Sequence, residues 1–207
     1  MTRYAPGALA HAVEDAWCEA WASLERVAEE PRTIVERAAD HIKVFTPGLE
    51  DSLLNIVLRY RASRRVTKDD VLAILAPFAR HGLHPQWWLL RGSEPTGLRE
   101  ALYAVGMHSW GAAPAMALDL RGWQPTYASV ESDLTCFRVT EHDDAMESLA
   151  VMTDVFHAPW MPMRRWTVAN PAALTYAARW HERIVSALTI IPTQGIAGVY
   201  NVATDDY

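Results

Sequence analysis

The sequence predicts an α/β fold of the α+β kind, with a mixed, largely antiparallel sheet flanked by helices. Two observations support this class. Strand-like and helix-like segments alternate from about residue 52 onward, and two clear apolar strands, Ile184–Ile191 and Ile196–Thr204, are joined at residues 193–195 as a hairpin. The alternation occurs on both sides of residue 125, so we expect two similar halves.

The first half begins with an expected helix from Leu9 to Ala39, interrupted at Pro31, because apolar residues recur at three- and four-residue spacing. A buried strand is expected at Ser52–Tyr60. A helix should follow Thr67, whose hydroxyl can cap it. The remaining elements expected in this half are strands at Gln86–Leu90 and Ala115–Leu120 and a helix that begins at Pro95–Leu102.

The second half follows a linker at 121–125. It should contain a strand at Thr135–Val139, then a helix capped by Asp143 or Asp144, then a loop at His157–Val168. Residues 171–180 are expected to be helical, with a merge into a strand near the turn at 181–183 as the alternative. The predicted organisation is therefore a helical N-terminal segment (1–46), a first half (47–125) and a second half (126–207).

Composition excludes several classes of protein. The chain has 207 residues and a net charge of -6, so we expect neither nucleic acid nor membrane as a partner. Cys18 and Cys136 are too few for a disulfide framework or a zinc cage. Because no apolar run is long enough to span a bilayer and the first residues lack a signal-peptide core, a cytoplasmic location is expected.

Residues 135–207 resemble the GCN5-related N-acetyltransferase (GNAT) superfamily. In that family antiparallel strands lead into a central strand, which is followed by a glycine-rich turn at a helix N-terminus. The segment Gly198–Thr204, followed by two acids and a tyrosine, is typical of the residues just ahead of that turn. The stretch HPQWWLLRGSEPTGLREALYAVGM and the later PAMALDL are similar to the degenerate N-terminal half of bacterial tandem GNAT proteins.

The resemblance implies acetyl-CoA as cosubstrate. Its pyrophosphate is best held by backbone N–H groups of a glycine-rich turn at a helix N-terminus. In the family this turn has an Arg/Gln-x-x-Gly-x-Gly/Ala pattern, and the printed sequence does not contain it. We therefore expect a chain truncated before the loop, which binds acetyl-CoA weakly or not at all.

The resemblance also assigns roles to residues. The backbone of Asn201, Val202, Ala203 and Thr204 would run along the pantetheine arm, and one N–H would polarise the thioester carbonyl. The alternative is that these residues form an ordinary central strand without a role in binding. Glu182, Asp205 and Asp206 are candidate bases, directly or through water, or simply solvated charges. His81 and His84 have a spacing that suits a metal, but no third ligand is evident.

Two functions remain open at this point. One is a tandem GNAT enzyme that transfers acetyl from coenzyme A to a primary amine of a small molecule or protein. The other is a non-catalytic ligand-binding or dimerisation module. The strand Ile196–Thr204 should lack a neighbour on one side, so we expect it to pair with a second copy, to aggregate or to be covered by the first half.

Overall fold

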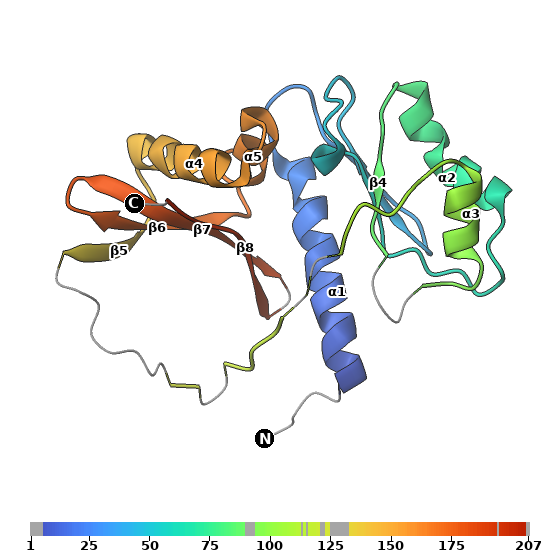
Figure 1. Cartoon of the computed structure of the whole chain (residues 1–207), viewed down its shortest axis with the longest axis horizontal. Coiled ribbons are helices and arrows are strands. Elements are labelled where there is room, and N and C mark those ends of the chain that lie inside the picture. Colours follow the sequence, from blue (N-terminus) through green and yellow to red (C-terminus); the bar gives the residue numbers. More distant parts are fainter. Residues whose placement is uncertain are drawn as a thin grey trace. The chain divides into compact units, whose positions relative to one another are not determined.

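The computed structural model describes residues 6–89, 94–112, 114, 116–120, 123–124, 133–193 and 195–205. Its contacts divide the chain into two compact units, which are shown in Figure 1. We call Trp17–Pro114 the N-unit, and Met1–Ala16 together with Ala115–Tyr207 the C-unit. Each unit carries one four-stranded sheet among its described residues.

The N-unit opens with the end of helix α1 (Pro6–Ala22) and a short 3-10 helix, η1 (Ser23–Arg26). Its sheet has the strand order β1-β2-β3-β4; β1–β3 are antiparallel, and β4 is parallel to β3. The strands are β1 (Ile34–Arg37), β2 (Ile42–Phe45), β3 (Ile56–Leu58) and β4 (Gln86–Trp87); the helices are η2 (Ser52–Leu54), α2 (Lys68–Arg80) and α3 (Leu98–Ala104).

A parallel neighbour requires a crossover, and α2 supplies it between β3 and β4. The apolar face of α2 packs on the sheet and on α3. Val71 and Phe78 of α2 and Leu98 of α3 belong to this core, and each is at most 1% exposed. Burial of such side chains stabilises the unit by roughly 1.5–3 kcal/mol each. The connection of β3 to α2 is therefore held between a packed strand and a packed helix.

The C-unit sheet is antiparallel throughout, in the order β5-β6-β7-β8. Its elements are β5 (Leu134–Arg138), α4 (His142–Phe156), α5 (Trp160–Trp166), β6 (Leu174–Trp180), β7 (Arg183–Thr193) and β8 (Ile196–Thr204). Figure 1 shows α4 and α5 over one face of this sheet. Leu149, Met152 and Met163 of these helices pack against Ala187 and Ala203 of the strands.

Polar contacts align α4 with the sheet. Asp144 accepts a hydrogen bond of 2.5 Å from Arg179 of β6, whose guanidinium lies over the Phe137 ring at 4.7 Å. The Glu147 carboxylate accepts the backbone N–H of Ile184 at 2.8 Å. This N–H lies beside a register shift between β6 and β7, where a ladder partner is missing. The carboxylate therefore replaces a backbone acceptor.

The fold class and the two-sheet organisation expected from the sequence are confirmed. Several elements of the first half differ. The helix expected to reach Ala39 ends earlier, and Ile34–Arg37 is a strand, because Ile34 and Val35 pair with Phe45 and Val44. The opening segment is thus not helical throughout residues 1–46. Residues Ser52–Leu54 form a 3-10 turn, and Met116–Leu120 is not part of a strand.

The second half contains two further corrections. Trp160–Trp166 is helix α5, although a loop was expected from its prolines. Leu174–Trp180 is strand β6, although a helix was expected, because it pairs with β5 on one side and β7 on the other. Most of the linker expected at 121–125 lies outside the described residues. Within the described ranges, no helix has the length and apolar character needed to cross a bilayer.

Candidate functional site

A β-bulge on β8 is the most distinctive backbone feature of the C-unit. Ala187 pairs with Ala203 and Thr189 pairs with Tyr200, so Asn201 and Val202 together oppose Leu188. Asn201 has a φ of 51°, in the left-handed region that asparagine tolerates better than most residues. A bulge of this kind bends the strand and disrupts its ladder locally, which is why bulges are frequent beside binding sites.

Two buried polar atoms close to the bulge lack a hydrogen-bond partner among the described residues. They are Nδ2 of Asn201 and Oγ1 of Thr189, whose residue is fully buried. Tyr200 packs edge-on against Trp166 of α5, with ring centroids 5.7 Å apart, and its hydroxyl lies where a Cβ at residue 198 would stand. Buried donors and acceptors normally find partners, so these two atoms are open to a water or a ligand.

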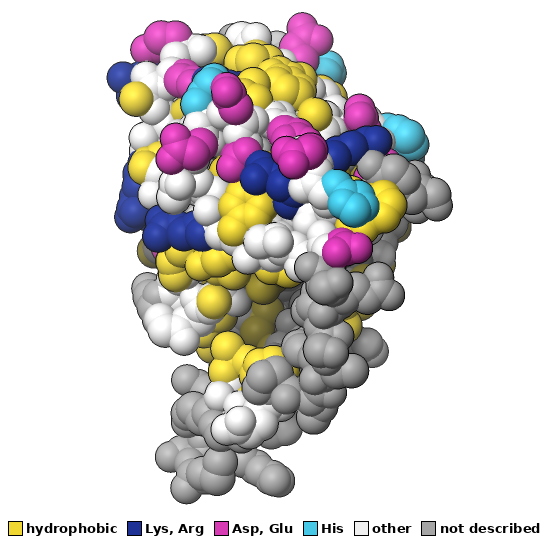
Figure 2. All heavy atoms as spheres, turned by 90° about the vertical axis from the view of Figure 1, so that its left-hand side faces the viewer, with side chains coloured by type: hydrophobic (Ala, Val, Ile, Leu, Met, Phe, Trp, Pro, Cys, Tyr) yellow, Lys and Arg dark blue, Asp and Glu magenta, His cyan; other side chains and the backbone are white. Residues whose placement is uncertain are grey.

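The far edge of β8 has no strand beside it in the described part of the chain. An antiparallel edge strand directs about half of its N–H and C=O groups away from its one neighbour. Residues Ile196–Thr204 include no charged side chain. Val199 and Val202 are 54% and 57% exposed. Figure 2, which views the molecule from the left-hand side of Figure 1, shows mixed acidic and basic side chains above a region richer in hydrophobic ones.

The predicted cofactor-binding residues Asn201, Val202, Ala203 and Thr204 all lie at or next to the bulge. Val202 is exposed, whereas Ala203 is 1% exposed and packs in the core. The Thr204 hydroxyl lies 3.0 Å from that of Ser186, which also donates to the Ala203 carbonyl at 2.7 Å. Within residues 201–204, the backbone groups and the side chain of Asn201 are thus the groups that can still form hydrogen bonds with a ligand.

The predicted bases lie at one end of the same sheet. Glu182 is exposed in the turn between β6 and β7, after His181 with its φ of 53°. Asp205 follows β8, forms an ion pair with Arg183 and donates its N–H to Val185 at 2.8 Å. Four residues of extended chain separate Asp205 from Asn201, which is about 13 Å. Asp206 lies outside the described residues.

The N-unit contains a strand–turn–helix–strand segment. β3 leads through a turn, residues 59–67, to the N-terminus of α2, and β4 then pairs in parallel with β3. We call residues 59–67 the α2 turn. It contains four arginines, at 59, 61, 64 and 65, and no glycine. The sequence predicted Thr67 as a cap, whereas the parallel pairing of β3 with β4 was not expected from it.

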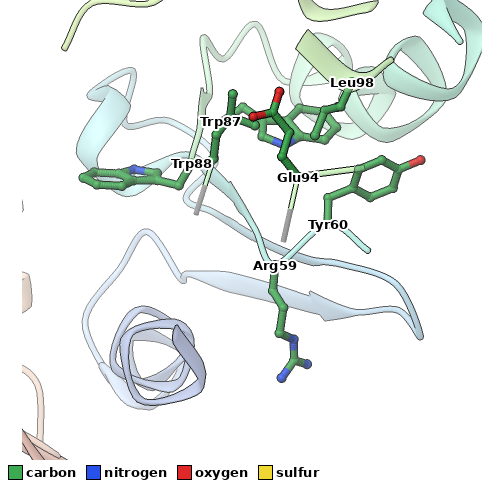
Figure 3. A pocket seen from close by; sticks show the side chains of 7 residues that line it. Arg59, Tyr60, Trp87, Trp88, Glu94 and Leu98 are labelled. Atoms are coloured by element: carbon green, nitrogen blue, oxygen red, sulfur yellow. The ribbon is translucent and has the colours of Figure 1, made fainter. Parts of the chain in front are cut away.

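Figure 3 shows the side chains that line a small pocket just beyond the C-terminal ends of the paired strands β3 and β4. Tyr60 meets Trp87 edge-on, with ring centroids 5.4 Å apart. Burial, followed by the charges of Asp70 and Asp40, raises the pKa of Tyr60. The remaining cavity volume is about 10 Å³, which holds one water molecule. Its lining residues are Arg59, Tyr60, Trp87, Trp88, Leu89, Glu94 and Leu98.

Other candidate chemistry is not supported. No group of three His, Cys, Asp or Glu among the described residues could hold a metal, so His81 and His84 gain no third ligand there. The ring of His81 instead lies beside Phe45, with centroids 5.9 Å apart. A larger, open hollow of about 420 Å³ in the C-unit is lined mainly by alanines of α1 with Thr193 and Ile196.

Comparison with known proteins gives a structural likeness but no sequence match. No protein-family model matches the sequence, and neither does any curated protein. Among solved structures, a GCN5-related N-acetyltransferase from Kribbella flavida superimposes with a TM-score of 0.67 at 16% sequence identity. The match covers 94% of this chain and 72% of the other. The fold is therefore the GNAT fold, and at this identity the likeness establishes the fold alone.

Proposed function

We propose that this protein is a GNAT-type N-acetyltransferase whose strand β8 holds the acyl-pantetheine arm of acetyl-CoA. The acceptor would be a primary amine of a small molecule or protein. The observation that carries the proposal is the bulge at Asn201–Val202 on an open edge, beside two buried polar atoms without described partners. These features fit an extended chain of amides that ends in a thioester.

The residues of β8 would act mainly through their backbone. Bound acetyl-CoA would supply an activated acetyl group as a thioester. Outward N–H and C=O groups of residues 201–204 would pair with the amides of the arm, as a further strand does. One N–H at the bulge would stabilise the negative charge that develops on the carbonyl oxygen, an effect of about 3 kcal/mol. Asn201 would add its side-chain amide.

The acceptor amine must lose a proton before or during attack. Glu182 and Asp205 are the carboxylates proposed for this role, and the distance along the strand requires water between them and the bulge. Asp205 is paired with Arg183, whereas Glu182 has no ion pair among the described residues. Glu182 is therefore the better candidate, and its replacement by glutamine should slow transfer without affecting binding of the thioester.

The coenzyme pyrophosphate fits the described residues poorly. The α2 turn has no glycine, and its helix N-terminus already binds a carboxylate, that of Asp70. The small pocket beyond the ends of β3 and β4 has room for one water. These observations favour a role without catalysis for the N-unit. They leave β8 as the place where acetyl transfer is proposed.

Binding of two thioesters tests the proposal. We expect acetyl-pantetheine to shift the backbone amide resonances of residues 199–204, and acetyl-CoA to bind with a Kd within about threefold of it, because the pyrophosphate adds no contact. Asn201→Val, which strains the bulge, should abolish these shifts, while Leu72→Ala on exposed α2 should not. Shifts confined to other residues, or none at saturating ligand, would refute the proposal.

A further inference from the structure

In the N-unit, strand β3 leads through the α2 turn to the N-terminus of helix α2. A helix N-terminus presents free N–H groups and partial positive charge, which favour a negative group. The arginines of the α2 turn add to this charge. A phosphate would be favoured there if nothing else occupied the position.

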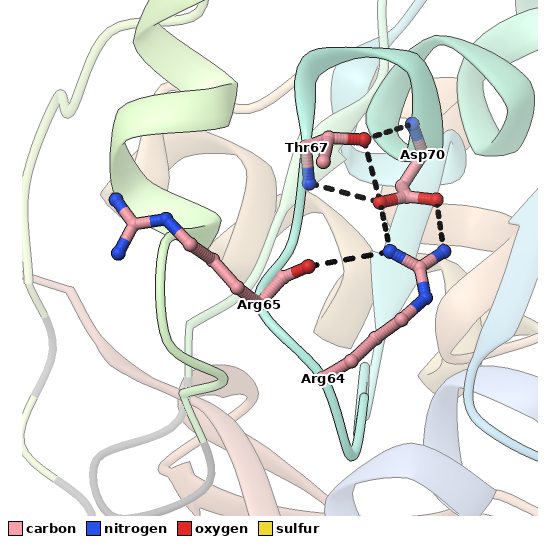
Figure 4. A network of polar contacts seen from close by, with 4 residues as sticks. All are labelled: Arg64, Arg65, Thr67 and Asp70. Carbon is pink, nitrogen blue, oxygen red and sulfur yellow. Dashed lines mark hydrogen bonds and ion pairs between the residues drawn. The ribbon is translucent and has the colours of Figure 1, made fainter.

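Asp70 occupies it. Its Oδ2 accepts the Thr67 N–H at 2.9 Å and the Thr67 hydroxyl at 2.7 Å, as Figure 4 shows. Arg64 donates to both carboxylate oxygens, Nη1 to Oδ2 at 2.8 Å and Nη2 to Oδ1 at 2.5 Å. A two-point contact of this kind is how arginine binds carboxylates and phosphates. The contacts from Arg64, and then those from Thr67, hold the pKa of Asp70 well below its usual range.

The turn is also fixed from the side of α3. The Val66 N–H donates to the Thr96 carbonyl at 2.9 Å. Gly97, with a φ of 83°, lies so close that an added Cβ would stand 2.9 Å from the Val66 carbonyl oxygen. Only glycine combines that backbone conformation with that approach. The α2 turn is thus held in the shape that lets Arg64 and Thr67 converge on Asp70.

We infer that Asp70 is a built-in anion, whose carboxylate takes the position at the N-terminus of α2 that an external phosphate would need. The N-unit is accordingly a scaffold and not a second coenzyme site. The size of the pocket beyond the ends of β3 and β4 is an independent observation in the same direction, since about 10 Å³ leaves no space for a thioester arm. The inference concerns the N-unit alone and stands whether or not β8 holds a thioester.

Titration with inorganic pyrophosphate, followed by the backbone amide resonances of residues 67–70, tests this inference. The unaltered chain should show no saturable shift there at millimolar ligand. Asp70→Ala frees Arg64 together with the N–H and hydroxyl of Thr67, so it should bind pyrophosphate at least tenfold more tightly. Adding Arg64→Ala to that variant should remove the gained affinity. Asp69→Ala, which removes an equal charge one residue away, is the matched control and should gain no such affinity.

The expected helix content of each variant is checked by circular dichroism. Asp70→Asn keeps the size of the side chain and loses its charge, so it replaces Asp70→Ala in the test if that variant fails to fold. Its affinity for pyrophosphate should also increase. Saturable binding of pyrophosphate at residues 67–70 in the unaltered chain would overturn the inference by itself. So would folded Asp70→Ala and Asp70→Asn variants that gain nothing.

Discussion

At the scale of single residues, the backbone conformation of Asn201 decides whether β8 keeps its bulge. Its φ of 51° lies in a region that costs most L-residues roughly 1–2 kcal/mol, and a β-branched residue is among the least suited to it. We expect Asn201→Val to lower the free energy of unfolding by about that amount. Asn201→Gly should change it little, because glycine adopts this φ readily.

Urea denaturation measures both variants of Asn201, and the comparison separates backbone from side chain. If glycine destabilised the protein as much as valine does, the amide side chain and not the left-handed conformation would be the important feature. Glycine also removes the Nδ2 atom that has no described partner. Asn201→Gly should therefore keep the bulge while weakening the binding of a thioester.

At the scale of elements, the open edge of β8 is the feature with the largest consequence. Edge strands in natural proteins usually carry a charge, a proline or a covering segment that prevents pairing with other chains. β8 carries no charge, and Val199 and Val202 add exposed apolar surface on one face of the sheet. We therefore predict concentration-dependent association of the isolated chain through this strand.

Val202→Lys is expected to reduce this association, because a lysine on an edge strand discourages pairing with another chain. Light scattering over a dilution series gives the measurement. Leu72→Lys adds the same charge at a residue that is 45% exposed on α2, and it should leave the association unchanged. An unaltered chain that stays monomeric at every concentration would contradict the prediction.

At the scale of the whole molecule, each unit has its own core. Phe78 of the N-unit and Met152 of the C-unit are both fully buried. Phe78→Ala should cost about 3–5 kcal/mol and Met152→Ala about 2–5 kcal/mol. We expect hydrogen exchange to rise mainly in the unit that carries the substitution, because local opening follows cooperative units. Equal acceleration in both units would show that they unfold as one.

The sequence by itself was sufficient for the elements that have local signals. The helix after Thr67 has its cap in the four residues that begin it, and the hairpin of β7 and β8 has long apolar strands around a turn. Segments with weaker local signals were misassigned. Ile34–Arg37 and Leu174–Trp180 are strands because each pairs in a hairpin with the strand that follows it, β2 or β7, and this pairing outweighs the helix-like spacing of their side chains.

The candidate sites, too, were predicted in part from the sequence. Residues 201–204 were proposed as a cofactor site from the sequence of their strand. The bulge, in contrast, depends on the register between β7 and β8, which only the paired strands define. The local sequence is sufficient to predict that Thr67 caps its helix. The inference that Asp70 takes the place of a phosphate depends on the parallel pairing of β3 with β4, since strand order is a property of long-range contacts.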